Sequence, residues 1–329
     1  MQIMHLQVVA GLILLLIGGD LLVRGAVSLA QRLDVPTIVI GLTVVAFGTS
    51  APELVVCVNA ALSGAPTLAL GNVVGSNIAN VLLVIGLPAM IYPISCCAPT
   101  VTRDAYLMVL GSALFLILAW TGVLGFWQGL LLLILLVLVM SYSARRACQY
   151  PELAQEELAD FDAIAQVPHS LLLSIAFIAL GLGGLAYGSH NLIEGSIALA
   201  RAHHVSESTI GLTVVALGTS LPELATVIAA ALKKHSDVAI GNVIGSNLFN
   251  MFGIMGITAM IAPIPVPDAF RYYDLWVMLA SSSLLLFFGL GGHHGIDRKI
   301  GFGFVALYAA YIASLVMGAS AISPPGGAI

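Results

Sequence analysis

Charged side chains are scarce in this chain and make up only 8% of its 329 residues, whereas soluble domains carry about 25%. Sixty per cent of the residues are hydrophobic, and the mean hydropathy is +1.06. The formal net charge is only -5, so the chain offers no basic surface for a nucleic acid. These values exclude a soluble globular domain and a nucleic-acid-binding protein, and they indicate a protein that lies in a lipid bilayer.

Cysteine is also rare, with four residues at Cys57, Cys96, Cys97 and Cys148. None of them belongs to a CxxC pair, and adjacent cysteines such as Cys96 and Cys97 rarely form a useful disulfide. The pattern argues against a zinc or redox centre, and we expect the cysteines to be packing residues.

Long apolar runs, by contrast, are abundant and predict an all-α membrane protein of about ten transmembrane helices, since each span needs ~20 mostly apolar residues. The N-terminal run has no basic region and no small-residue cleavage site, so we expect a retained span and not a signal peptide. The first and sixth spans are long enough to lie tilted. The expected spans are 3–30, 37–62, 68–92, 104–121, 125–147, 170–200, 207–232, 238–262, 273–290 and 300–320.

The second half of the chain repeats the first at a constant offset of 170 residues. Between 40 and 54, thirteen of the fifteen residues equal their partners 170 positions later. The segment GNVVGSNIAN at 71–80 returns as GNVIGSNLFN at 241–250. The strongest similarity therefore joins a motif at 41–80 to a second motif at 211–250.

This duplication predicts two five-helix repeats, 1–147 and 170–329, joined by a short linker at 148–169. Five spans is an odd number, so the second repeat enters the membrane from the opposite side and the two repeats are inverted. The linker carries five acidic residues, and we expect it to be a solvated helical segment.

The basic residues indicate how the chain lies in a cell (inner) membrane. In this topology Arg201 and Arg271 fall on one side, and nine basic residues fall on or near the other. Because basic residues are enriched on the cytoplasmic side, we expect both termini outside and the linker in the cytoplasm. The nine are Arg24, Arg32, Arg103, Arg145, Arg146, Lys233, Lys234, Arg298 and Lys299.

Each repeat carries a proline and a glutamate inside its second helix, in GTSAPEL at 48–54 and GTSLPEL at 218–224. Pro52 lacks an N–H and clashes with the carbonyl of Gly48, so the second helix should open near Ala46 to Thr49. Carbonyl groups without partners are costly in hydrocarbon, and a desolvated cation can replace the lost hydrogen bonds. We therefore expect the second and seventh helices to be broken around an ion site.

The side chains around the expected break are oxygen ligands. Thr49 and Glu53 are four residues apart and share a helix face, with Ser50 beside them. The third helix adds a polar stripe of Asn72, Ser76 and Asn80, with Asn77 beside it. Such oxygens suit hard cations, and Ca²⁺ takes six to eight of them. Apart from Cys57, no nearby histidine or cysteine favours zinc or copper. The second repeat supplies Thr219, Ser220, Glu223, Asn242, Ser246 and Asn250.

The cost of two buried carboxylates favours a bound cation over a structural kink. One ionised carboxylate at the membrane centre costs ~3 kcal/mol, and two nearby carboxylates repel each other. One Ca²⁺ or several Na⁺ would neutralise both carboxylates. The site should therefore change to the other-facing state when it is filled and fail to do so when it is empty. A kink in which Thr and Ser bond to their own backbone is the structural alternative. Asp20 and Arg24, four residues apart, are expected to form a local ion pair.

These motifs, GTSAPEL with GNVVGSNIAN and GTSLPEL with GNVIGSNLFN, resemble the two alpha repeats of the cation/calcium antiporter superfamily, especially its prokaryotic sodium/calcium exchanger-like members. The resemblance implies that Glu53 and Glu223 are shared acidic ligands of calcium. It implies that Thr49, Ser50, Thr219 and Ser220, with the carbonyls of Ala46 and Ala216, complete calcium and sodium sites. It assigns further ligands to Ser76, Ser246, Asn80 and Asn250.

Differences between the motifs of this chain and those of related antiporters indicate which ion is coupled to Ca²⁺ transport. Potassium-dependent relatives tend to carry Asp where this chain has Asn80 and Asn250, and proton-coupled relatives usually show a GNxxE signature that it lacks. We therefore expect a monomeric secondary antiporter, not an enzyme, that exchanges Ca²⁺ for Na⁺ by alternating access and needs no cofactor. Its first and sixth helices are expected to slide against the bundle that holds the site.

Two other functions stay open at this point. The nearest is a Ca²⁺/H⁺ or other divalent cation/proton antiporter, in which the two carboxylates carry protons because desolvation favours their neutral form. A more remote one is an intramembrane hydrolase that uses paired acids or a metal-activated water. The internal repeat argues against the hydrolase, which has no need of an inverted duplication.

Overall fold

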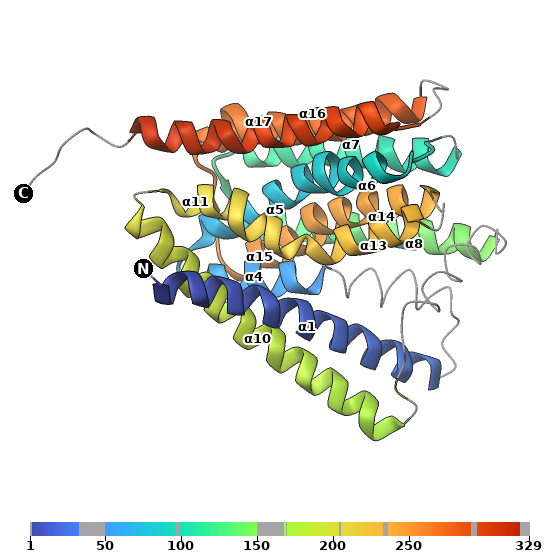
Figure 1. Ribbon diagram of the computed structural model, residues 1–329, viewed down its shortest axis with the longest axis horizontal. Coiled ribbons are helices and arrows are strands. Elements are labelled where there is room, and N and C mark those ends of the chain that lie inside the picture. The colour runs from blue at the N-terminus through green and yellow to red at the C-terminus, as the bar shows by residue number, and fades with distance from the viewer. Residues whose placement is uncertain are drawn as a thin grey trace, which may run out of the picture.

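The computed structural model describes residues 2–32, 50–96, 99–149, 168, 170–203, 205–232, 236–290 and 295–322. These residues are almost entirely helical (Figure 1), which confirms the prediction of an all-α membrane protein. In this part of the chain, eight helices are long and apolar enough to cross a membrane. A ninth span results if the bent pair Glu207–Thr219 and Leu221–Leu232 counts as one.

The helices of the first half match the expected spans to within a few residues, except that residues 37–49 of the second span lie outside the described residues. Its third span has a π-helical turn, η2, between two α-helical parts. The elements are α1 (Gln2–Arg32), α4 (Ala51–Leu62), α5 (Pro66–Ala79), η2 (Asn80–Ile85), α6 (Gly86–Ile91), α7 (Pro99–Ala119), β1 (Val123–Leu124) and α8 (Phe126–Gln149).

The second half follows the same order, and the expected linker at 148–169 lies almost wholly outside the described residues. Three of its spans contain a π-helical turn. The elements are α10 (Leu171–Ala202), α11 (Glu207–Ile210), η3 (Gly211–Val215), α12 (Ala216–Thr219), α13 (Leu221–Leu232), α14 (Ser236–Leu248), η4 (Phe249–Ile254), α15 (Met255–Ile261), β2 (Ile264–Pro265), η5 (Phe270–Asp274), α16 (Leu275–Leu290) and α17 (Arg298–Ile322).

The two longest helices, α1 and α10, pack against each other as an antiparallel pair at one side of the bundle (Figure 1). A Cβ atom on Gly11 would lie 2.6 Å from the backbone nitrogen of Leu192, and one on Gly181 would lie 2.6 Å from that of Leu22. Only glycine allows backbones to approach so closely. The close packing recurs every seven residues, at Gly11, Gly18 and Gly25 of α1 and at Gly181, Gly188 and Gly195 of α10.

Short extended segments join the helices at two places that the all-α prediction did not include. Strand β1 pairs with β2 in antiparallel fashion, with Leu124 opposite Ile264. Ile94 and Ile296 also form an antiparallel bridge. Positions 94 and 264 are 170 residues apart, so the same extended segment occurs in both halves. Prolines near these segments remove backbone N–H donors and favour extended backbone over helix.

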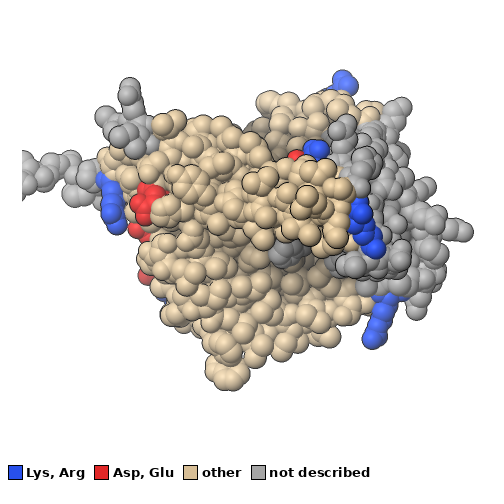
Figure 2. Space-filling view, turned by 90° about the horizontal axis from the view of Figure 1, so that it is seen from below, with Lys and Arg blue, Asp and Glu red and all other residues tan. Residues whose placement is uncertain are grey.

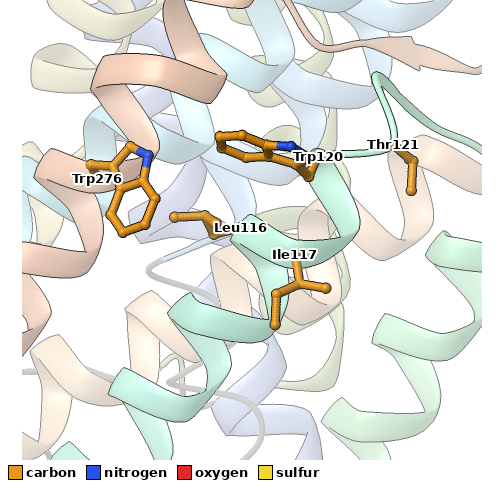
Figure 3. Close-up of a pocket in the computed structure, with 5 residues that line it drawn as sticks. All are labelled: Leu116, Ile117, Trp120, Thr121 and Trp276. Atoms are coloured by element: carbon orange, nitrogen blue, oxygen red, sulfur yellow. The ribbon is translucent and has the colours of Figure 1, made fainter.

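Charged side chains gather toward the two ends of the face seen in Figure 2, with a broad uncharged area between them. Asp20 and Arg24 form the expected ion pair at 2.9 Å. An open apolar groove of about 550 Å³ is lined by Leu116, Ile117, Trp120, Thr121 and Trp276 (Figure 3). Its two tryptophan rings lie 6.5 Å apart where α7 ends and α16 begins, as is common for aromatic residues at a membrane surface.

Candidate cation-binding site

Ser50 and Ser220 occupy the same break in the two halves of the chain. Ser50 has φ -91° and ψ 4°, and Ser220 has φ -84° and ψ 5°, which are not helical values. The next helix begins directly after each serine, and its prolines, Pro52 and Pro222, occupy the first turn, where no N–H is needed. The two parts of the seventh span meet at an angle of 41°. The predicted break of the seventh helix is therefore confirmed.

The break falls later than the proline argument placed it. The expected opening at Ala46 to Thr49 lies outside the described residues, but its counterpart, α12, is helical. The N–H of Ser220 still pairs with the carbonyl oxygen of Ala216 at 3.1 Å. The helix consequently continues to Thr219 and breaks at Ser220, and Pro222 is the first residue that lacks a donor.

The two glutamates lie one turn beyond these breaks and are both 1% exposed. Glu53 belongs to α4 and Glu223 to α13, and their carboxylates are close enough to interact electrostatically. The hydroxyl of Ser50 donates to Oε1 of Glu223 at 3.5 Å and so links the two halves. Within the described residues, neither carboxylate oxygen of Glu53 has a hydrogen-bond partner. A buried charge without partners is costly and is normally balanced by an opposite charge.

Neutral oxygen atoms without partners lie next to these helices or on elements that contact them. Asn80 begins η2, which contacts α13, and Asn250 lies in η4, which contacts α4. The described part of the chain offers no hydrogen-bond donor to the side-chain oxygens of Asn80 and Asn250, and Ser220 Oγ has no partner there either. Buried oxygens that lack donors are the groups that a desolvated hard cation coordinates.

All ten described members of the predicted ligand set are buried, whereas Thr49 and Ala46 lie outside the described residues. The hydroxyl of Thr219 donates toward Asn72 Oδ1 at 3.0 Å and toward the Val215 carbonyl at 3.1 Å. The hydroxyl of Ser76 lies 3.5 Å from the Ala216 carbonyl. The ten are Ser50, Glu53, Ser76, Asn80, Ala216, Thr219, Ser220, Glu223, Ser246 and Asn250.

An asparagine cluster at the centre of the molecule joins the two halves, and the sequence argument mentioned only part of it. Asn80 donates to Asn247 Oδ1 at 3.0 Å, and Asn250 donates to Asn77 Oδ1 at 3.1 Å. These four residues form two pairs at the offset of 170, so their contacts obey a two-fold relation between the halves. The cluster holds the amide nitrogens of Asn80 and Asn250, which leaves their oxygens directed elsewhere.

The helices α7 and α16 complete this cluster with residues that the sequence argument missed. Met108 and Met278 accept from the side chains of Asn247 and Asn77, at 3.4 Å and 3.7 Å. The hydroxyls of Ser112 and Ser282 lie 3.1 Å apart. Each pair is again separated by 170 residues, and that shared offset is the signal that would have found them.

Cys57 is buried, as expected of a packing residue, but it also makes hydrogen bonds. Its sulfur lies 3.6 Å from the Ala69 carbonyl oxygen and 3.2 Å from Asn72 Nδ2. In the described part of the chain, no three His, Cys, Asp or Glu side chains gather as they would around zinc or iron. The arrangement instead offers two carboxylates and several neutral oxygens, which is a ligand set for Ca²⁺ or Na⁺.

Comparisons with known proteins agree with this ligand set. The family model described as "Sodium/calcium exchanger protein" matches the chain twice, over residues 4–145 and 173–317. The inner membrane protein YrbG of Escherichia coli K12 is 36% identical over 276 residues, which cover 83% of this chain and 85% of that protein. The sodium/calcium exchanger MaX1 of Methanosarcina acetivorans is 31% identical, and the match covers 93% of this chain and 96% of that protein.

A solved structure has the same fold. The sodium-calcium exchanger NCX_Mj, soaked with 2.5 mM Na⁺ and 0.1 mM Ca²⁺, matches with a TM-score of 0.64 and 31% sequence identity. The match covers 94% of this chain and 97% of that chain.

Proposed function

This chain belongs to the sodium/calcium exchanger protein family, and we propose that it is a secondary antiporter that exports Ca²⁺ in exchange for Na⁺. The observation that carries the proposal is the pair of buried carboxylates, Glu53 and Glu223, one from each half of the chain. Two relatives are named as sodium/calcium exchangers, which supports these two ions as the substrates. In this proposal transport is the movement of ions and not an enzymatic reaction, and it needs no cofactor.

In this proposal Glu53 and Glu223 bind one Ca²⁺ between them, and Na⁺ ions replace it on the return step. The neutral oxygens of Ser50, Thr219 and Ser220 complete the coordination, together with Thr49 and the carbonyls of Ala46 and Ala216. Ser76, Ser246, Asn80 and Asn250 supply further oxygens. The repulsion between two unneutralised carboxylates opposes the change of the empty site from the state that faces one side to the state that faces the other, so transport in one direction requires transport in the other.

The helices α1 and α10 are the moving part in this proposal. Their glycines bring the two backbones into contact along much of their length, so the pair should move as one unit. The site itself lies in helices that are tied together across the two halves by the asparagine cluster. Sliding of a stiff pair against a stiff bundle would expose the site to each side in turn.

The decisive experiment measures Ca²⁺ uptake by purified protein in lipid vesicles under an imposed Na⁺ gradient, and then under an imposed pH gradient. We expect the Na⁺ gradient to drive uptake and the pH gradient to fail. Uptake driven only by the pH gradient would instead assign the protein to the Ca²⁺/H⁺ antiporters.

Variants of the two glutamates test the site in the same vesicles. We expect Glu53→Gln and Glu223→Gln each to abolish Ca²⁺ flux while the purified protein stays folded, because each removes one of the two charges that balance the cation. Glu194→Gln, which changes an exposed glutamate of α10, is the matched control and should transport normally. Normal flux in either site variant would refute the assignment.

The proposed setting is the cell membrane, with both termini outside and the linker at 148–169 in the cytoplasm. The bias of nine basic residues against two supports this orientation. A single chain contributes both glutamates, so a monomer suffices for the proposed site. Accessibility of a terminal tag to a protease in intact cells tests the orientation, and light scattering of the purified protein tests its oligomeric state.

A further inference from the structure

Cys57 lies one turn beyond Glu53 on α4 and is fully buried. Its thiol has one proton, and the Ala69 carbonyl oxygen, 3.6 Å away, is the acceptor for it. The sulfur atom must therefore accept in its other contact, with Nδ2 of Asn72 at 3.2 Å. Because the thiol proton is already used, Cys57 selects the amine end of the Asn72 side chain and not its oxygen end.

This choice determines what Asn72 presents to Thr219. With its nitrogen toward Cys57, Asn72 directs Oδ1 toward the hydroxyl of Thr219, which donates to it at 3.0 Å. The single proton of that hydroxyl is then directed to Asn72 or to the Val215 carbonyl. The Thr219 oxygen keeps its lone pairs for another partner, and the hydroxyl lies close to the Glu53 carboxylate.

The opposite orientation of the amide would have the reverse effect. An Asn72 side chain turned by 180° would place its NH₂ group against Thr219 and donate to the Thr219 oxygen. That donor would occupy a lone pair and repel a cation in contact with the same oxygen. The orientation of one buried amide thus decides whether Thr219 can serve as a ligand.

The second half of the chain lacks this arrangement. The residue 170 positions after Cys57 is Val227, whose side chain has no group that can accept a hydrogen bond. The residue equivalent to Asn72 is Asn242, whose Nδ2 has no partner in the described part of the chain. The duplication therefore does not account for the cysteine, and the two halves of the site differ in how firmly an asparagine amide is held.

We propose that Cys57 is a positioning residue that orients the Asn72 amide and thereby keeps the Thr219 oxygen free to bind the transported cation. This inference rests on the proposed function, in which Thr219 is a ligand. Cys57 itself acts only through its hydrogen bonds and does not contact the ion. The residue that fills this position consequently sets the affinity for the hard cation without taking part in its coordination.

The test compares Cys57→Val with Cys57→Thr in the full-length protein in vesicles. The two side chains have nearly the same shape, but only threonine offers an oxygen that can donate to Ala69 and accept from Asn72. We expect Cys57→Val to raise the KM for Ca²⁺ about five- to tenfold, with little change in maximal rate. This factor corresponds to the net free energy of one hydrogen bond. Cys57→Thr should stay within about twofold of the unmodified protein.

A binding measurement accompanies the flux assay. Stabilisation of the purified protein by added Ca²⁺ in a thermal unfolding experiment should require about five- to tenfold more Ca²⁺ for Cys57→Val than for Cys57→Thr. If the valine variant does not fold, Cys57→Ala and Cys57→Ser provide the same comparison with smaller side chains. Equal KM values for the two members of the folded pair would overturn the proposal, since shape and not hydrogen bonding would then matter.

Glu53→Gln, measured in the same vesicles, separates this inference from the proposed function. Loss of flux in Glu53→Gln together with an unchanged KM in Cys57→Val would overturn the role of Cys57 alone. Normal flux in Glu53→Gln would overturn the proposed function and the inference with it.

Discussion

Asn77 and Asn247 hold each other through their side chains and main chains at the centre of the molecule. Asn247 donates from Nδ2 to the Asn77 carbonyl at 3.2 Å, and Asn77 donates from Nδ2 to the Asn247 carbonyl at 3.4 Å. Both side chains are at most 1% exposed. The two halves of the chain therefore meet through a reciprocal polar contact and not only through apolar packing.

The first prediction concerns this contact. We expect Asn247→Leu to lower the free energy of unfolding by about 1–3 kcal/mol, because it leaves the buried side-chain amide of Asn80 without a partner and removes one of the donors to the Asn77 carbonyl. Thermal unfolding of the purified protein in detergent would measure the loss. Asn191→Leu is the control, because among the described residues Asn191 bonds only to Tyr187 on its own helix, and its change should stay within about 0.5 kcal/mol. Equal losses of unfolding free energy in the two variants would show that the central contact does not stabilise the protein.

The second prediction concerns the close approach of α5 to the seventh span. A Cβ atom on Gly75 would lie 2.6 Å from the Leu212 carbonyl oxygen and 2.7 Å from the Ala216 Cβ. We expect Gly75→Ala to cost about 1–3 kcal/mol of stability through overpacking and to lower Ca²⁺ flux, because α12 leads directly to the break at Ser220. Thermal unfolding and vesicle uptake measure the two effects.

A glycine with open space is the control for that change. A Cβ on Gly303 of α17 would meet no described atom within 4 Å, and alanine favours a helix by about 1 kcal/mol over glycine. We therefore expect Gly303→Ala to be neutral or slightly stabilising. A Gly75→Ala protein as stable and active as Gly303→Ala would contradict the close packing described above.

The third prediction concerns the contact between the proposed moving pair and the helix that carries Glu53. Asn59 of α4 donates to the hydroxyl of Ser189 on α10 at 3.0 Å. The corresponding residues in the other half are Gly19 and Ala229, which cannot form such a bond. We expect Ser189→Ala to weaken the contact by about 0.5–1.5 kcal/mol and so to favour separation of α4 from α10.

Hydrogen–deuterium exchange measures this separation. The amides of α4 should exchange about two- to tenfold faster in Ser189→Ala than in the unmodified protein, as a weakening of that size implies. Ser196→Ala is the control on the same helix, because Ser196 Oγ has no partner in the described part of the chain. Identical exchange in the two variants would mean that this hydrogen bond does not hold α4 to α10.

The fourth prediction concerns Asp274, a buried acid that takes no part in the proposed site. Its Oδ1 accepts a hydrogen bond from the hydroxyl of Tyr311 at 2.9 Å. We expect Tyr311→Phe to cost about 1.5–3 kcal/mol in thermal unfolding, the usual value for a bond to a charged group. Tyr308→Phe should be nearly neutral, because the Tyr308 hydroxyl is unpartnered among the described residues. A neutral Tyr311→Phe would show that Asp274 is balanced by some other group.

Much of the fold could be predicted because the membrane limits the possible structures. Apolar runs of about twenty residues must form helices when no water is present to bond the backbone. A break in the seventh helix and the burial of Glu53 and Glu223 were likewise expected, since the prolines and the two acids interrupt the apolar pattern at equivalent positions. The break lies at Ser220, just beyond the stretch that the proline argument indicated. The π-helical turns could not be predicted, because nothing in the residue pattern of η2 distinguishes it from the α-helix around it.

The amino-acid sequence by itself determined the membrane class, the duplication and the acidic residue that each half contributes, because these depend on composition and on spacing along the chain. The tertiary structure alone decided which buried polar groups meet. Cys57 selects one end of Asn72, and Met108 accepts from Asn247, because helices distant in sequence place single atoms within hydrogen-bonding distance. Such contacts depend on how helices are rotated and packed against one another, and the periodicity of a single helix carries no information about its neighbours.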